Sequence, residues 1–379
     1  MKLKEREKNF ILAGGTLIGT IIGAGIFGLP YVFSRSGVLV ALFYFLLLGG
    51  LVLLLNLFFG EIVLRTEKKH RLVGYAEKYL GKKAKIIETI SIIFGASASL
   101  LVYIILMGNF LKIIFPGGLS SFHFALISWF VLCLFVYLGI ESIISFETIM
   151  NIGLFAVFIL VIVLSLFKIK TGNIILADKN YFFLPFGIFL FSLVGWNAVP
   201  EVEQILKKKR DLKKVITSAI GIVILFYFFF GLILSGVAGK ETTKQVFQGL
   251  PLFLGKKIIL FGGLFGFLAV ATSFLVLANY LKNTLRFDYK FPYIAAFLFA
   301  AGVPLCFYLL GVREFLGIIS FVGGFIGMID GTIICLVYKK AKKEGNREPE
   351  YSLKIPNFLI YFLIAVLILG ALSQVIYYF

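Results

Sequence analysis

The sequence predicts an all-α polytopic membrane protein with about eleven transmembrane helices. Of the 379 residues, 60% are hydrophobic, well above the roughly 45–50% apolar content of a soluble domain. The mean hydropathy is +1.02, and only 15% of the residues are charged. Such a chain lacks the polar surface to cover a water-soluble globule, so we expect a single membrane domain over residues 1–379.

Apolar runs bounded by charged residues, Pro or Gly divide the chain into segments of membrane-spanning length. The eleven predicted spans, numbered in chain order, lie near residues 10–34, 38–64, 86–115, 121–140, 143–168, 181–206, 214–238, 257–281, 291–311, 314–338 and 356–378. The division between the ninth and tenth is marked only by a turn at residues 311–314.

The net charge of +18 is explained by where the basic residues lie. Lys and Arg cluster at residues 1–8, 65–85, 207–214 and 338–354, in the connections that face the cytoplasm if the N-terminus is inside. Basic cytoplasmic loops are typical of membrane proteins. We therefore predict a cell-membrane protein with a cytoplasmic N-terminus and an outside C-terminus, and no nucleic-acid partner.

Spans 1 and 6 are interrupted by Gly and Pro at residues 14–30 and 185–201. Free backbone groups are costly in hydrocarbon, so such breaks persist only where protein or a wet cavity satisfies them. Two interrupted spans that lie five apart predict two five-helix repeats, 10–168 and 181–338, with the binding site at the breaks. The odd number of spans per repeat inverts the second copy, and residues 356–378 form a peripheral helix. Close helix packing explains part of the glycine content of span 1.

Three motifs resemble those of the amino acid–polyamine–organocation superfamily, most closely its aromatic and hydroxy amino acid permease branch, the tryptophan/tyrosine permease family. They are Gly-x-x-Ile-Gly-x-x-Ile-Gly-Ala-Gly-Ile-Phe-Gly-Leu-Pro at 15–30, Phe-Gly-Glu at 59–61 and Ala-x-x-Thr-Ser-Phe at 269–274. The resemblance implies a 5+5 inverted repeat of the leucine-transporter type with helices 1 and 6 broken. It also implies a symporter that imports an amino acid by alternating access.

Broken helices can satisfy both charged ends of an amino acid. Backbone N–H groups that open a second half-helix in span 1 suit the carboxylate, and carbonyls that end the first half of span 6 suit the ammonium. The candidate substrate-binding residues are Gly23, Ala24, Gly25, Ile26, Phe191, Ser192, Leu193, Trp196 and Asn197. Because spans 3, 6 and 8 carry no deep Lys or Arg, we expect a neutral, apolar or aromatic substrate. The alternative for each aromatic residue alone is ordinary packing.

The resemblance implies that the coupling ion is Na+ or H+. Sodium-coupled relatives bind the ion with residues that correspond here to Gly19, Ile22, Ala269, Thr272 and Ser273. The alternative is that the two hydroxyls only bond back to their own helix carbonyls. Span 5 lacks the Lys that some proton-coupled relatives carry, which favours sodium.

Proton coupling stays open, because intramembrane acids are costly and are candidates for function. Asp330, Glu201 and Glu61 are the proton-relay candidates. Two of them also have a structural explanation, since Glu61 can pair with Arg65, and Glu201 and Glu203 with the lysines at 207–209.

Other functions are less well supported by the sequence. The sequence contains no grouping of His, Cys and acidic residues that is typical of an enzyme's active site. No cofactor is expected besides the coupling ion. An amino-acid-sensing receptor on the same fold, which binds without transport, is the alternative function. The expected partners are a small-molecule amino acid and the lipid bilayer, with no obligate protein partner.

Overall fold

All secondary structure in the described part of the chain is helical. The computed structural model describes residues 2–138, 159–246, 255–287 and 289–378. The long helices are α3 (Val38–Arg65), α5 (Lys82–Ile114), α6 (Ser121–Leu138), α10 (Leu212–Ala238), α13 (Lys256–Phe287) and α17 (Asn357–Tyr378). Within the described residues, eight helices, or nine with one bent pair, are long and apolar enough to cross a membrane.

The predicted number of eleven spans is matched in part. The ninth predicted span corresponds to the shorter apolar helix α14 (Tyr293–Leu309). The fifth, at 143–168, falls mostly outside the described residues, of which 159–166 are helical. The all-helical class is confirmed, and the number of eleven remains a prediction.

Span 1 consists of two helices separated by a bend. Helix α1 (Lys2–Ile21) is followed by the 3-10 turn η1 (Ala24–Gly28) and helix α2 (Leu29–Ser36), and the two parts are inclined by 50°. Pro30 lies in the first turn of α2, where its missing N–H costs no hydrogen bond. We call residues 22–23 the span 1 break.

Span 6 is also interrupted, but its two parts continue as one span, Pro185–Ile205, without a bend as large as that of span 1. Helix α8 (Pro185–Leu193) ends before the 3-10 turn η4 (Trp196–Ala198) and helix α9 (Val199–Ile205). Each of these two half-helices carries a proline in its first turn, Pro185 in α8 and Pro200 in α9, which favours starting a new helix over continuing the old one. We call residues 194–195 the span 6 break.

Span 10 changes its helical geometry halfway along, which the sequence did not predict. Helix α15 (Phe315–Phe321) passes through a π-helical turn, η7 (Val322–Ile326), into α16 (Gly327–Glu344). A Cβ at Gly323 would lie 1.9 Å from the carbonyl oxygen of Gly187, so glycine lets this turn lie directly on α8. π-helical turns of this kind are frequent at functional sites.

A short helix, α4 (Leu72–Leu80), occupies the basic connection after span 2. Gly81, with φ of +88°, joins it to α5, a backbone conformation that favours glycine. Helix α4 packs against both α5 and α16. The connection is therefore a folded cap on one end of the bundle, where the sequence predicted only a loop.

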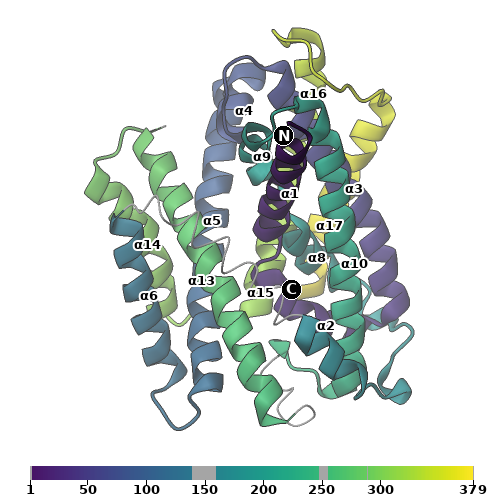
Figure 1. The fold of residues 1–379 in the computed structure, drawn as a ribbon, viewed down its shortest axis with the longest axis vertical. Helices are drawn as coiled ribbons and strands as arrows, with labels where there is room; N and C mark the ends of the chain where they lie inside the picture. The colour runs from purple at the N-terminus through teal and green to yellow at the C-terminus, as the bar shows by residue number, and fades with distance from the viewer. Residues whose placement is uncertain (1, 139–158, 247–254, 288, 379) are drawn as a thin grey trace.

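The half-helices lie in the middle of the bundle. Figure 1 shows α6 and α14 on one side of α5, α13 crossing α5, and α3 and α10 on the other side of the molecule. Helix α8 contacts α3, η1 and η7. The two breaks are thus enclosed by packed helices, as a substrate site between repeats requires.

Candidate functional site

The span 1 break opens with an extended residue followed by free backbone donors. Gly23 has φ of −124° and ψ of −147°, and its own N–H donates to the carbonyl of Ile21 at 2.9 Å. The first residues of a helix have no intrahelical acceptor for their N–H groups. In the 3-10 turn η1 these are Ala24 and Gly25, both buried, because the i to i−3 pattern already uses the third N–H, that of Ile26. The predicted donor set therefore narrows to these two, because the amide of Gly23 is also used.

Two tyrosines surround this break, and sequence reasoning missed both. A Cβ built on Gly23 would lie 3.5 Å from the hydroxyl of Tyr103 in α5 and 3.7 Å from the hydroxyl of Ser273 in α13. From the other side, Tyr227 in α10 donates its hydroxyl to the carbonyl of Ile21 at 2.9 Å. Hydroxyl groups from three helices thus meet the frayed end of α1. Only their three-dimensional placement distinguishes these tyrosines from the chain's other fifteen.

The segments beside the two breaks touch each other, namely η1 after the span 1 break and the end of α8 before the span 6 break. A Cβ at Gly25 would lie only 2.2 Å from Oγ and 2.8 Å from Cα of Ser192. A Cβ at Gly195 would lie 2.5 Å from Cγ1 of Ile21. Each break thus places a glycine against the other span. The predicted carboxylate donors and ammonium acceptors are thereby brought to one place.

The carbonyl end of α8 matches the predicted ammonium site. The last four carbonyls of a helix lack intrahelical partners, and α8 ends at Leu193. The hydroxyl of Ser192 donates to the carbonyl of Ile188 at 2.7 Å, which leaves its lone pairs facing η1. Phe191 is half-buried and packs against the hydrophobic core.

Trp196 and Asn197 differ in their surroundings. The Trp196 side chain is completely buried, and its indole N–H faces Asp330 without making a hydrogen bond of ordinary geometry. Asn197 is exposed. The predicted polar contact at 197 therefore does not point into the buried break in this conformation, whereas Trp196 links span 6 to span 10.

The predicted ion-site hydroxyls bond to their own helix. Thr272 donates to the carbonyls of Leu268 and Ala269 at 3.0 and 2.9 Å. Ser273 donates to the carbonyl of Ala269 at 2.9 Å. These are the bonds back to the helix that the alternative expects, and each hydroxyl oxygen keeps lone pairs for a further ligand.

The structure also brings span 8 to the span 1 break, since Ser273 lies beside Gly23. Of the two remaining predicted carbonyl ligands, Ile22 is buried and Gly19 is half-buried on the last turns of α1. A sodium site between spans 1 and 8 stays a prediction with compatible placement.

Glu61 is held by structural partners. It is completely buried, pairs with Arg65 at 2.8 Å, and accepts hydrogen bonds from Ser352 and the amide of Leu353 at 2.9 and 2.7 Å. The pair with Arg65 that the spacing suggested is therefore confirmed. These contacts attach the connection after span 10 to the end of α3.

Glu201 lies near the surface. Its carboxylate is 3.8 Å from Arg71, and 47% of its side chain is exposed. The neighbouring Glu203 pairs with Lys209 at 3.0 Å and with Lys69 at 2.9 Å. These acids link α9 to the basic connections at the N-terminal end of the bundle.

Asp330, the third acid that the sequence singled out, is buried in α16 beside α5. It is 6% exposed and accepts a hydrogen bond from Ser91 of α5 at 2.6 Å. One turn before Ser91, on the same face of α5, lies Glu88, which is completely buried and which sequence reasoning missed. An acid six residues into an apolar helix is a candidate for function on the same ground as Asp330.

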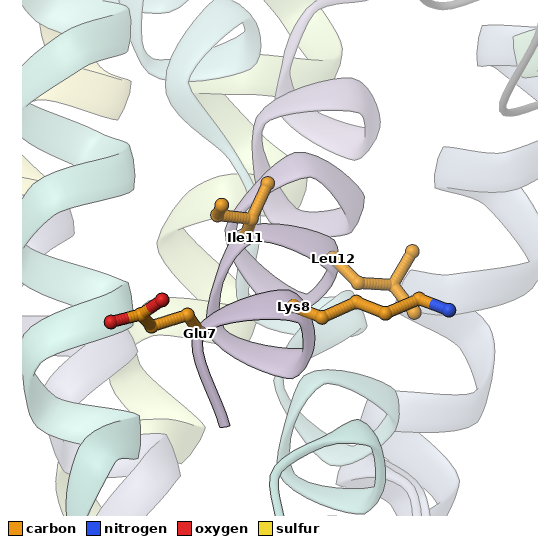
Figure 2. A pocket seen from close by; sticks show the side chains of 4 residues that line it. All are labelled: Glu7, Lys8, Ile11 and Leu12. Carbon is orange, nitrogen blue, oxygen red and sulfur yellow. The ribbon is translucent and has the colours of Figure 1, made fainter. Parts of the chain in front are cut away.

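A hollow on the surface of α1 lies away from both breaks. It is lined by Glu7, Lys8, Ile11 and Leu12 (Figure 2). These residues all belong to one helix, and Ile11 is 73% exposed. Because a helix rises about 1.5 Å per residue, Ile11 is roughly 18 Å along the axis from Gly23, so we do not assign the substrate to this hollow.

Comparisons with known proteins agree with this architecture. The model of the tryptophan/tyrosine permease family matches residues 6–374. The tyrosine-specific transport system 1 of Haemophilus influenzae is 26% identical over 197 residues, which are 51% of this chain and 49% of that protein. The alignment thus spans about half the length of that relative. The crystal structure of MhsT in complex with L-phenylalanine superposes with a TM-score of 0.69 at 16% identity, covering 98% of both chains, so the two share the leucine-transporter type of fold.

Proposed function

Because the chain belongs to the tryptophan/tyrosine permease family, we propose that it is a secondary active transporter that imports a neutral, apolar or aromatic amino acid by alternating access. The observation that carries this proposal is the contact beside the two breaks, between Gly25 of η1 and Ser192 of α8. There, free amides of η1 lie beside free carbonyls of α8, so both charged ends of a zwitterion can be satisfied without a charged side chain. The fold match to a transporter structure supports the same reading.

The polarity of the site favours a neutral side chain on the substrate. Residues 14–30 and 185–200 contain no charged residue. Helix α13 extends beyond its predicted end and includes the buried Lys282, whose ammonium donates to the carbonyl of Val136 at 2.6 Å. Lys282 lies nine residues, or roughly 13 Å along the helix, beyond Ser273. It is therefore too distant to pair with a substrate carboxylate at the break.

The N-terminus is proposed to lie in the cytoplasm. Ion pairs join the basic segments at one end of the bundle: Arg6 with Asp211 at 2.7 Å, and Lys69 with Glu203 at 2.9 Å. Arg347 donates to the carbonyl of Leu64 at 2.9 Å, which adds the last basic segment. Positive charge gathered at a single end is typical of the cytoplasmic side.

A counterflow experiment tests the function directly. Proteoliposomes preloaded with unlabelled tryptophan, tyrosine, phenylalanine or leucine are expected to take up the labelled amino acid, while arginine and glutamate give no exchange. A receptor on this fold would bind without exchange. Preference for arginine or glutamate would contradict the neutral-substrate proposal.

Uptake measured in potassium medium under an imposed pH gradient distinguishes coupling to Na+ from coupling to H+. A sodium-driven carrier would be inactive there, and Thr272→Ala would weaken its sodium dependence more than its substrate binding at saturating sodium. The reason is that linked sites have a coupling free energy of about 1–3 kcal/mol. Uptake as fast as in sodium medium would instead assign the driving force to protons.

A further inference from the structure

Glu88 and Asp330, which we call the acid pair, are buried together where α5 packs against α16. Glu88 is completely buried and Asp330 is 6% exposed. Ser91, one turn after Glu88 on α5, donates a 2.6 Å hydrogen bond to Asp330, which places the two carboxylates near each other. Both oxygens of Glu88 lack a hydrogen-bond partner in the described part of the chain.

The groups that face the acid pair supply no compensating positive charge. On α13, Tyr280 interacts with Glu88, and the guanidinium of Arg71 lies over the Tyr280 ring at 4.1 Å. Lys85, one turn before Glu88, pairs with Glu77 of α4 at 2.8 Å. On α9, Glu201 pairs with Arg71. Across the described residues, no ion pair reaches either member of the acid pair.

Two carboxylates in one buried site cannot both be ionised without a cation, because each charge raises the cost of the other. At least one of the two carboxylates is therefore expected to carry a proton. Glu61 accepts hydrogen bonds from three residues, Arg65, Ser352 and Leu353, whereas Glu88 accepts none from the described residues. A structural acid would be satisfied, whereas a group that binds and releases a proton must be able to do without permanent partners.

A second observation connects the acid pair to the substrate site. The indole N–H of Trp196 is buried, unpartnered and directed at Asp330. Trp196 begins η4, directly after the span 6 break. An ionised Asp330 attracts this N–H, and a protonated one releases it, so proton occupancy biases the geometry of the break.

From this geometry, and resting on the proposed transport function, we infer that Glu88 and Asp330 form the binding site for a coupling proton. One proton binds a carboxylate oxygen of the pair from the outside-facing state and leaves from it to the cytoplasm. The exit runs past Tyr280 towards the half-exposed Arg71 and Glu201. Through Trp196, the protonation state of the acid pair affects the carbonyls of α8 that would bind the substrate ammonium.

The experiment compares two transport modes in proteoliposomes. A carrier that takes one proton per amino acid accumulates its substrate about tenfold per unit of imposed pH gradient, whereas counterflow needs no gradient. Glu88→Gln is expected to abolish gradient-driven accumulation while retaining counterflow, and Asp330→Asn is expected to do the same. Glu67→Gln, an exposed acid in the connection before α4, is the matched control and should accumulate substrate like the wild type.

A second measurement needs no variant. Amino acid added to the wild-type protein in weakly buffered detergent solution is expected to cause uptake of protons, and affinity should change by about 5- to 150-fold with the protonation of the pair. Absence of proton uptake in the wild type would overturn the inference, even if Glu88→Gln fails to fold. Wild-type accumulation by Glu88→Gln would overturn it too. Absence of counterflow in the wild type would instead overturn the proposed function itself.

Discussion

A Gly25→Val protein is expected to lose amino acid binding and part of its stability. The new Cβ would lie 2.2 Å from Oγ and 2.8 Å from Cα of Ser192. Backbone cannot rotate away as a flexible side chain can, so η1 and α8 would have to separate. Overpacking of this kind costs about 1–3 kcal/mol, and the separation moves the amides and carbonyls that would hold the substrate. Ligand-induced thermal shift of the purified protein measures both effects.

Gly23→Ala is the matched control, because its Cβ would make only ordinary contacts, at 3.5 and 3.7 Å from the hydroxyls of Tyr103 and Ser273. We expect it to keep the wild-type melting temperature and to bind more weakly, since the methyl group occupies space at the break. Wild-type affinity and stability in the Gly25→Val protein would contradict the assignment of the substrate site to the two breaks.

The interrupted spans could be located from the sequence because their cause is local. Glycine is a weak helix former, and Pro30 and Pro200 each favour the first turn of a new half-helix. The sequence does not show why position 25 requires glycine. Glycine was expected there to admit a substrate, whereas the structure shows that it also admits the Ser192 backbone of a span that is far away in sequence.

Residues from other helices could not be assigned to the site in the same way. Tyr103 and Tyr227 have ordinary positions in α5 and α10, and only their approach to the end of α1 gives them a role. Glu88 is different, because an acid in an apolar helix is a candidate for function in any sequence. Its partner Asp330 was recognised, yet 242 positions separate the two, and no periodicity connects them.

Glu61 shows the opposite outcome, an intramembrane acid whose contacts favour a structural role. Its Oε1 accepts from Arg65 and from Ser352, and its Oε2 accepts from the amide of Leu353. These partners come from α3 itself and from the connection after span 10. The carboxylate thus fixes that connection against the end of α3.

Replacing Glu61 by Gln is therefore expected to destabilise the protein by about 3–5 kcal/mol, because breaking a buried ion pair leaves an uncompensated charge. The amide nitrogen of Gln would also face one of the donors that the carboxylate accepts, and Arg65, with only 16% of its side chain exposed, would lose its anion. Glu67→Gln, an exposed acid two residues beyond Arg65, is the control and should unfold like the wild type.

Thermal unfolding of the purified proteins measures the loss, and proteoliposome uptake separates the two roles of Glu61. A structural acid lowers the melting temperature while the molecules that remain folded keep their gradient-driven accumulation. A proton relay would show the reverse, with wild-type stability and no response to the pH gradient. That reverse result would move the proton pathway from Glu88 and Asp330 to the end of α3, because a relay must lose coupling when its carboxylate is removed.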